Sequence, residues 1–172
     1  MTMQAKVLVV DDEPSVLKAI QRIFRHSDMI HLILSGDPVA ALNIALTSDI
    51  DLIVTDQQMP GMTGLQLLAQ LNEKKPEMVK IILTGMADVQ TAVQAINEVG
   101  VYKFILKPWN NDDLYWTVVR TVEMILMQRE KAMLVQEISK KDACLRRIEN
   151  IYPGISDIKR DEDGTIVIDD LW

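Results

Sequence analysis

Several features that would fix the class of this protein at once are scarce in its sequence. It has one cysteine, Cys144, among 172 residues, which excludes an internal disulfide framework and favours a reducing compartment. No apolar run approaches the length that a membrane span needs. The run near the N-terminus is cut short by Asp11 and Asp12, which argues against a signal peptide. We therefore expect a cytoplasmic protein without a membrane partner.

Clustered positive charge is also missing. The formal net charge is -7, whereas a protein that binds nucleic acid neutralises phosphates with clustered Lys and Arg. No helix-turn-helix pattern is readable, so a nucleic-acid partner is disfavoured. A hydrophobic content of 48% is enough to build a folded core.

The stretch 51–64 is the candidate functional centre and reads D-L-I-V-T-D-Q-Q-M-P-G-M-T-G. Its apolar run predicts a buried strand that ends by presenting the carboxylate of Asp56. Pro60 cannot continue a strand, and Gly61 and Gly64 are expected to supply turn conformations that other residues resist. Because ligands bind at the carboxyl edge of open α/β sheets, Asp56 is a candidate functional residue. The alternative is a loop acid that only hydrogen-bonds its own turn.

Strand and helix signals alternate along the chain. Short apolar or β-branched runs predict strands at 6–10, 30–34, 52–54, 79–83 and 101–106. Helical spacing and capping residues predict helices over 14–26, from 38, over 64–71, after 88 and from 110 onward. The pattern predicts an α/β fold, a doubly wound five-stranded parallel sheet of the flavodoxin-like class with helices on both faces.

Polar residues collect where these strands end. The residues at that edge are Asp11, Asp12, Glu13, Asp56, Thr84 and Lys107. Neighbouring carboxylates repel unless a cation lies among them, and hard oxygen ligands suit Mg²⁺. An ammonium and a hydroxyl can both bind the oxygens of an acyl phosphate. The set therefore predicts a site for phosphorylating a carboxylate. Glu13 alternatively only caps the first helix.

Four motifs carry a resemblance to a known family over roughly residues 5 to 125. They are V-L-V-V-D-D-E-P, V-T-D-Q-Q-M-P-G-M-T-G, I-I-L-T-G and F-I-L-K-P, each at a predicted strand end. With these motifs the chain resembles the receiver domain of bacterial two-component response regulators. The resemblance implies a sensor histidine kinase, or a phosphotransfer protein, as the phosphoryl donor.

The resemblance also implies a role for each matching position. Asp56 would be the phospho-acceptor. The Mg²⁺ ligands would be Asp11, Asp12, Asp56 and the backbone carbonyl of Gln58. The residues that respond to the phosphoryl group would be Thr84, Lys107 and the aromatic Phe104. The Lys107-Pro108 peptide bond would be cis.

The C-terminal part predicts a long helix followed by a short tail. No Gly or Pro interrupts residues 111–150. The residues at coiled-coil spacing are Leu134, Ile138, Leu145 and Ile148, with Lys141 in the same seam. This pattern predicts a homodimer. The alternative is a helix that packs on its own domain or on a missing output domain.

We accordingly expect a receiver domain at 1–126, an extended helix at 127–150 and a tail at 151–172. Two short strand signals, 155–160 and 165–168, flank the turn signal of 161–164 and predict a β-hairpin. The alternative is a frayed tail.

The function expected from these features is a phosphorylation-controlled switch that changes protein–protein contacts with an unknown downstream protein. It would not be an enzyme in the ordinary sense. One alternative is a constitutive scaffold whose receiver-like site is idle. Another is a phosphatase with an aspartyl nucleophile, but that chemistry needs a second acid two residues later, where this chain has Gln58.

Overall fold

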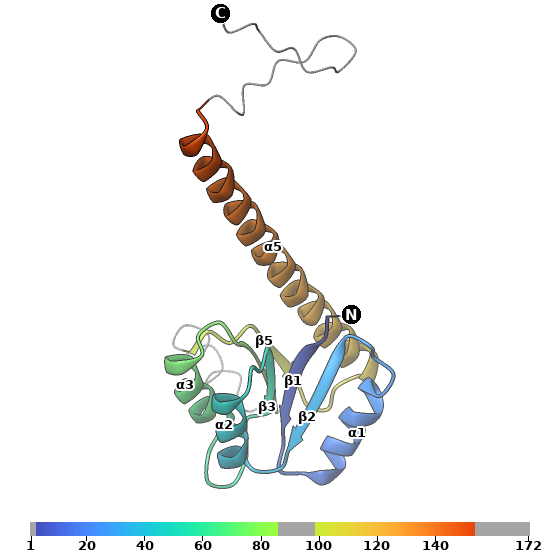
Figure 1. The fold of residues 1–172 in the computed structure, drawn as a ribbon. Helices are drawn as coiled ribbons and strands as arrows, with labels where there is room; N and C mark the ends of the chain where they lie inside the picture. The colour runs from blue at the N-terminus through green and yellow to red at the C-terminus, as the bar shows by residue number, and fades with distance from the viewer. Residues whose placement is uncertain (1–2, 86–98, 154–172) are drawn as a thin grey trace, which may run out of the picture. The chain divides into compact units, whose positions relative to one another are not determined.

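The computed structural model describes residues 3–85 and 99–153 (Figure 1). The strands are β1 (Ala5–Val10), β2 (Ile30–Ser35), β3 (Leu52–Asp56), β4 (Val79–Thr84) and β5 (Lys103–Leu106). The helices are α1 (Pro14–Phe24), α2 (Pro38–Thr47), α3 (Gly64–Lys74) and α5 (Asn111–Ile151). The helix predicted after residue 88 and the hairpin predicted at 155–168 lie outside the described residues.

The five strands form one parallel sheet in the order β2-β1-β3-β4-β5, which confirms the predicted sheet. The register aligns the strand ends, because Val10 pairs with Thr55, Asp56 with Leu83, and Thr84 with Leu106. The residues that follow these strands therefore meet at one edge.

Alternating side chains divide the core into two layers. Val7 and Val9 of β1 join a buried cluster with residues of α1 and α5. Leu8 and Val10 face the other way, into a cluster with residues of α2 and α3. Successive residues of a strand point to opposite faces, so both faces of the sheet are covered.

Several boundaries differ from the sequence expectation. Helix α1 ends at Phe24, α3 continues to Lys74, and β5 begins at Lys103 rather than at 101. Gly100 has φ +67°, a conformation that glycine adopts without strain, so the chain is still turning just before β5. This turn accounts for the late start of the strand.

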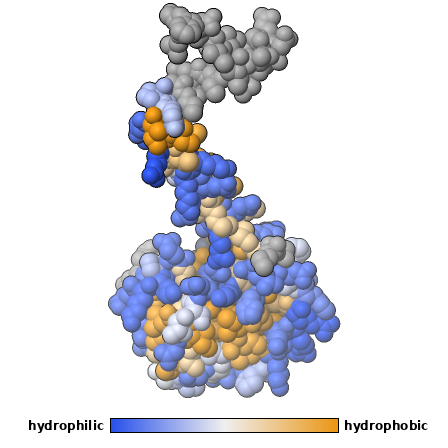
Figure 2. All heavy atoms as spheres, viewed as in Figure 1, coloured by the Kyte–Doolittle hydropathy of each residue, from blue (hydrophilic) through white to orange (hydrophobic). Residues whose placement is uncertain are grey.

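The chain divides into two compact units, Met1–Met127 and Gln128–Trp172. Within the second unit, every α5 residue from 130 to 148 is exposed. Figure 2 shows hydrophobic and hydrophilic residues interspersed along this part of the helix. Among the described residues, no helix combines the length and apolarity that crossing a membrane requires.

One lysine, Lys80 of β4, is buried in the first unit, with 1% of its surface exposed. Its Nζ donates to Asn72 Oδ1 at 3.0 Å, to the Met78 carbonyl at 3.0 Å and to the Pro76 carbonyl at 3.4 Å. Burial lowers the pKa of Lys80, and the charge of Glu77 partly opposes that shift. The ammonium thus ties the end of α3 and the following loop to β4.

Replacing Lys80 with methionine is expected to lower the free energy of unfolding by about 1–3 kcal/mol, because three acceptors lose their donor. Urea unfolding measures the loss. The matched control is Lys6→Met in β1, whose lysine is exposed. Equal stability of the two variants would show that the buried contacts contribute nothing.

Candidate functional site

Asp56 is the last residue of β3 and is buried. Its Oδ2 accepts a hydrogen bond from the backbone N–H of Gln58 at 3.2 Å. The backbone stays hydrogen-bonded to the sheet one residue beyond β3, since Gln57 N donates to the Leu83 carbonyl of β4 at 2.9 Å. The strand and the turn that follows it therefore fix the position of this carboxylate.

Lys107 joins Asp56 to a second buried acid, Asp11, which directly follows β1. The Lys107 Nζ lies 2.7 Å from Asp56 Oδ1 and 2.8 Å from Asp11 Oδ2. Asp11 Oδ1 also accepts the backbone N–H of Glu13 at 2.9 Å. The structure thus brings together three residues that are remote in sequence, from the ends of β1, β3 and β5.

The charges of this trio affect one another. Burial raises the pKa of Asp11, although the hydrogen bond from Lys107 pulls it back. Burial alone would lower the pKa of Lys107. The hydrogen bonds to Asp11 and Asp56 and the charges of both acids have a larger effect and raise this pKa. The site therefore holds a cation firmly between two carboxylates.

Thr84 and Lys107 are held side by side by the backbone. Thr84 ends β4 and is buried, and its carbonyl accepts the N–H of Lys107 at 2.8 Å. The Thr84 hydroxyl donates to the Gly85 carbonyl at 3.3 Å. The Lys107-Pro108 peptide bond is cis, as expected.

The glycines after Asp56 have different roles. Gly61 has φ +81°, the turn conformation that the sequence predicted. For Gly64 that explanation is wrong, because it is the first residue of α3 and has no positive φ. A Cβ on Gly64 would overlap the backbone carbonyl oxygen of Asp56. Its lack of a side chain lets α3 begin directly against the end of β3.

A side-chain pattern that the sequence analysis missed fixes the start of α3. Thr63 accepts the N–H of Gln66 at 3.2 Å, and Gln66 Oε1 accepts the N–H of Thr63 at 3.0 Å. This reciprocal pair is a capping box, and T-x-x-Q in the sequence was its signal.

The expected metal ligands are only partly assembled. Asp12 is exposed, unlike Asp11 and Asp56. Among the described residues, no group of three or more His, Cys, Asp or Glu side chains could hold a metal ion. The donor chemistry nevertheless fits Mg²⁺, since two buried carboxylates already share one cation and hard oxygen ligands suit this ion.

The remaining predicted residues are Gln58, whose backbone N–H donates to Asp56, Phe104 and the seam residues. Phe104 of β5 is half-buried and packs against the core cluster of α2 and α3. Gln58 is exposed. The seam residues belong to the second unit and are exposed: Leu134, Ile138, Leu145 and Ile148.

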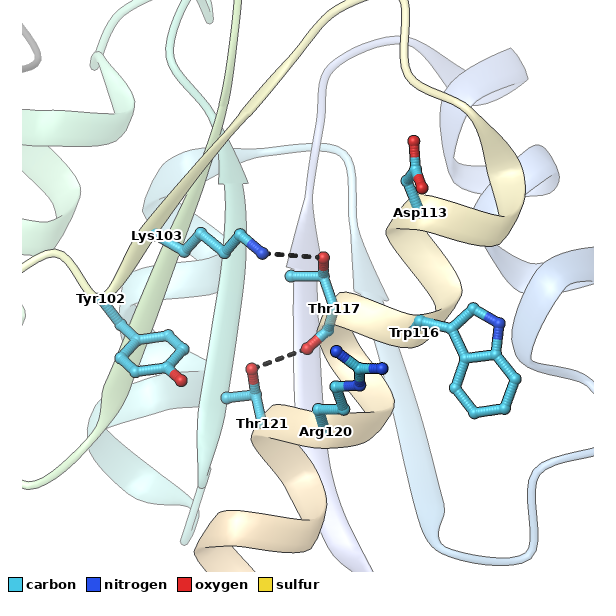
Figure 3. A pocket seen from close by; sticks show the side chains of 7 residues that line it. All are labelled: Tyr102, Lys103, Asp113, Trp116, Thr117, Arg120 and Thr121. Carbon is cyan, nitrogen blue, oxygen red and sulfur yellow. Dashed lines mark hydrogen bonds between the residues drawn. The ribbon is translucent and has the colours of Figure 1, made fainter.

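A separate hollow of about 540 Å³ lies between the start of β5 and α5 (Figure 3). Within it, Lys103 Nζ donates to the Thr117 hydroxyl at 3.2 Å, and the Thr121 hydroxyl to the Thr117 carbonyl at 2.7 Å. Its lining residues are Tyr102, Lys103, Asp113, Trp116, Thr117, Arg120 and Thr121. None of them belongs to the predicted phosphorylation site.

The family model of the response regulator receiver domain matches residues 7–119, which contain all three members of the trio. The chain belongs to this family. The receiver resembles crystal structures of a receiver domain protein from Clostridium thermocellum and of the receiver domain of an HD domain-containing protein from Pseudomonas fluorescens. The first has a TM-score of 0.65 at 27% identity and covers 72% of this chain and 98% of its own. The second has a TM-score of 0.68 at 28% identity and covers 76% and 95%.

Two curated relatives match most of this chain, but the match covers only about a third of their own length. The hydrogenase transcriptional regulatory protein HoxA of Cupriavidus necator is 36% identical over 144 residues, which are 84% of this chain and 30% of HoxA. The C4-dicarboxylate transport transcriptional regulatory protein DctD of Pseudomonas aeruginosa is 35% identical over 170 residues, 95% of this chain and 35% of DctD. The chain thus spans about a third of each relative.

Proposed function

We propose that the receiver accepts a phosphoryl group on Asp56 from a histidine kinase, or from a phosphotransfer protein, and thereby changes its contacts with other proteins. The observation that carries the proposal is the Lys107 ammonium, which bridges Asp11 and Asp56 at the carboxyl edge of the sheet. A carboxylate that is buried, fixed in position and paired with a cation is placed for attack on phosphorus.

In the transfer, an Asp56 oxygen forms a bond to phosphorus while the bond from phosphorus to the donor nitrogen breaks. Lys107 lies where its positive charge offsets the charge of the phosphoryl oxygens. Asp11, Asp12, Asp56 and the Gln58 carbonyl would hold Mg²⁺, which supplies further positive charge for those oxygens.

The phosphorylated state would differ from the free state in two local contacts. The Thr84 hydroxyl would exchange its bond to the Gly85 carbonyl for one to the phosphoryl group, and Lys107 would exchange part of its pairing with Asp11. Phe104, on the neighbouring strand, would follow these changes and alter the surface over β5. These differential contacts are what biases one state against the other.

The output is proposed to be a protein contact with a downstream partner or a second copy of the chain. HoxA and DctD are transcriptional regulatory proteins, but two thirds of each lie beyond the match, so that role is not carried to these 172 residues. A receiver domain is generally not a catalytic enzyme, and Gln58 stands where the phosphatase alternative needs an acid.

Acetyl phosphate with Mg²⁺ is expected to add one phosphoryl group to the wild type and none to Asp56→Asn, as intact-protein mass spectrometry would measure. The matched control is Asp51→Asn, which changes an acid at the opposite end of the same strand, where Asp51 Oδ2 accepts the Lys6 N–H. A wild type that takes up no phosphoryl group would favour the alternative, a constitutive scaffold with an idle site. Labelling of Asp56→Asn would place the acceptor elsewhere.

A further inference from the structure

The second unit presents an exposed apolar seam along α5. Its residues Leu134, Ile138 and Leu145 are 53%, 59% and 62% exposed, and Tyr152, which directly follows the helix, is 64% exposed. Together with Lys131, Lys141 and Ile148 they follow one another at alternating steps of three and four. This is the a/d spacing of a coiled coil, in which Ile138 and Leu145 are a positions and Leu134 and Ile148 are d positions.

The charged residues of 130–150 are arranged around that seam. The acids of this segment all occupy the flanking e and g positions: Glu130 and Glu137 at g, Asp142 and Glu149 at e. The outward positions b, c and f carry no acid, and bases such as Lys140, Arg146 and Arg147 lie there. On a helix that serves only as a solvated spacer, acids have no reason to avoid the outward positions.

The flanking acids favour a parallel pair of helices. An antiparallel pair sets g against g and e against e, and every charged residue at these positions is an acid. A parallel pair sets g against the next e of the other helix. That arrangement puts Glu130 beside Val135 and Cys144 beside Glu149. Only one acid then faces another acid, Glu137 against Asp142.

Lys141 neutralises that one unfavourable pair. Its Nζ lies 2.8 Å from Glu137 Oε1 of the same helix. As a d residue it also lies next to the e position of a second helix, which is Asp142 when the two helices are in register. The same register places the other seam lysine, Lys131 at an a position, beside the g residue Glu130. A shift by one heptad would also leave apolar seam residues unpaired at both ends.

We propose that this part of α5 binds a second copy of the chain as a parallel, in-register coiled coil, in which Lys141 of each copy pairs with Asp142 of the other. The proposal deepens the protein-contact output proposed above and rests on it for its biological role. A polar residue in a largely apolar seam specifies register and partner at a cost in affinity. Lys141 would therefore select the partner rather than simply strengthen binding.

Sedimentation equilibrium of the full chain, without any phosphoryl donor, tests the pairing. Lys141→Glu is expected to raise the dimer dissociation constant about tenfold, since it replaces two attractions to Asp142 by two repulsions. Asp142→Lys is expected to change the constant much less, because its lysine repels Lys141 of the other copy but attracts Glu137. An equimolar mixture of the two variants is expected to restore the affinity that Lys141→Glu loses, because the acid at position 141 of one copy then faces the lysine at position 142 of the other. The control Lys140→Glu makes the same charge change at an outward position and is expected to leave the constant unchanged.

A monomeric wild type, a mixture that stays as weak as Lys141→Glu alone, or an equal effect of Lys140→Glu would each overturn the proposal. These outcomes do not depend on Asp56. If the chain does not dimerise but Asp56 is labelled normally, only the coiled-coil proposal is rejected. If it dimerises as expected but Asp56 is not labelled, only the phosphorylation proposal is rejected.

Disulfide cross-linking tests the orientation. In a Cys144→Ser background, Leu145→Cys is expected to cross-link to the same residue of a second copy under mild oxidation, whereas the outward Ala143→Cys is not. In an antiparallel pair an a residue packs against d residues, so the Leu145→Cys cross-link would be lost and the proposal with it.

Discussion

Lys107→Met is expected to lower the free energy of unfolding by about 3 kcal/mol at neutral pH, because removing one partner of a buried ion pair leaves uncompensated charge. The variant keeps a side chain of similar length but leaves Asp11 and Asp56 together without their shared ammonium. Urea unfolding followed by far-UV circular dichroism measures the loss.

The deficit of Lys107→Met is expected to shrink as the pH falls. Burial raises the pKa of Asp11 in the folded protein, so the folded state binds this proton more tightly than the unfolded state. The cost of burying the Asp11 carboxylate is present above the raised pKa and is relieved as the pH falls through it. In the wild type, the raised pKa of Lys107 makes its stabilising contribution fully present below the ordinary lysine pKa and lost as the pH rises through the raised value.

Lys103→Met is the matched control, since it removes a nearby lysine, the first residue of β5, which donates to the Thr117 hydroxyl near the surface. Its loss is expected to stay well below that of Lys107→Met. A second check is Mg²⁺, which is expected to stabilise Lys107→Met more than the wild type because the variant has no other cation at the site. Equal stability of the two lysine variants at neutral pH would contradict the bridging role of Lys107.

The sequence was informative where one signal recurs in several places. Apolar runs that stop at Asp11, Asp56, Thr84 and Lys107 predicted both a parallel sheet and the edge at which these residues meet. The two carboxylates and the ammonium do meet there. The prediction succeeded because alternation of strands and helices restricts the topology, and the topology alone brings strand ends together.

The sequence was less informative where the outcome depends on contacts between elements. Both Asp11 and Asp12 were predicted as metal ligands, yet of the two only Asp11 is buried and paired with Lys107. The strand prediction at 79–83 included Lys80 without a special role, whereas the Lys80 ammonium donates to three oxygen acceptors inside the fold. Which of two adjacent acids turns inward, and whether a buried lysine finds partners, is decided by packing that a linear pattern does not contain.

Gly64→Ala is expected to lower the free energy of unfolding by about 2–3 kcal/mol, as overpacking does in a closely packed core. The added Cβ would overlap the Asp56 carbonyl oxygen and come within 3.1 Å of the Asp56 carbonyl carbon and 3.2 Å of the Gln57 Cα. These atoms belong to the backbone, so no side-chain rotation relieves the overlap. In a helix, alanine is otherwise more favourable than glycine by about 1 kcal/mol. Without the overlap, Gly64→Ala would therefore be expected to stabilise the protein.

The clash must displace either the start of α3 or the end of β3, and the end of β3 is Asp56. Gly64 N donates to the Gln57 carbonyl at 3.1 Å, and Leu65 N donates to Gln57 Oε1 at 3.2 Å, so the two elements cannot separate without losing both bonds. Labelling of Asp56 by acetyl phosphate is therefore expected to slow together with the loss of stability. Gly36→Ala is the control, because its Cβ meets no atom closer than 4.0 Å. If Gly64→Ala unfolds at the same urea concentration as Gly36→Ala and labels at the wild-type rate, the close approach of α3 does not position Asp56.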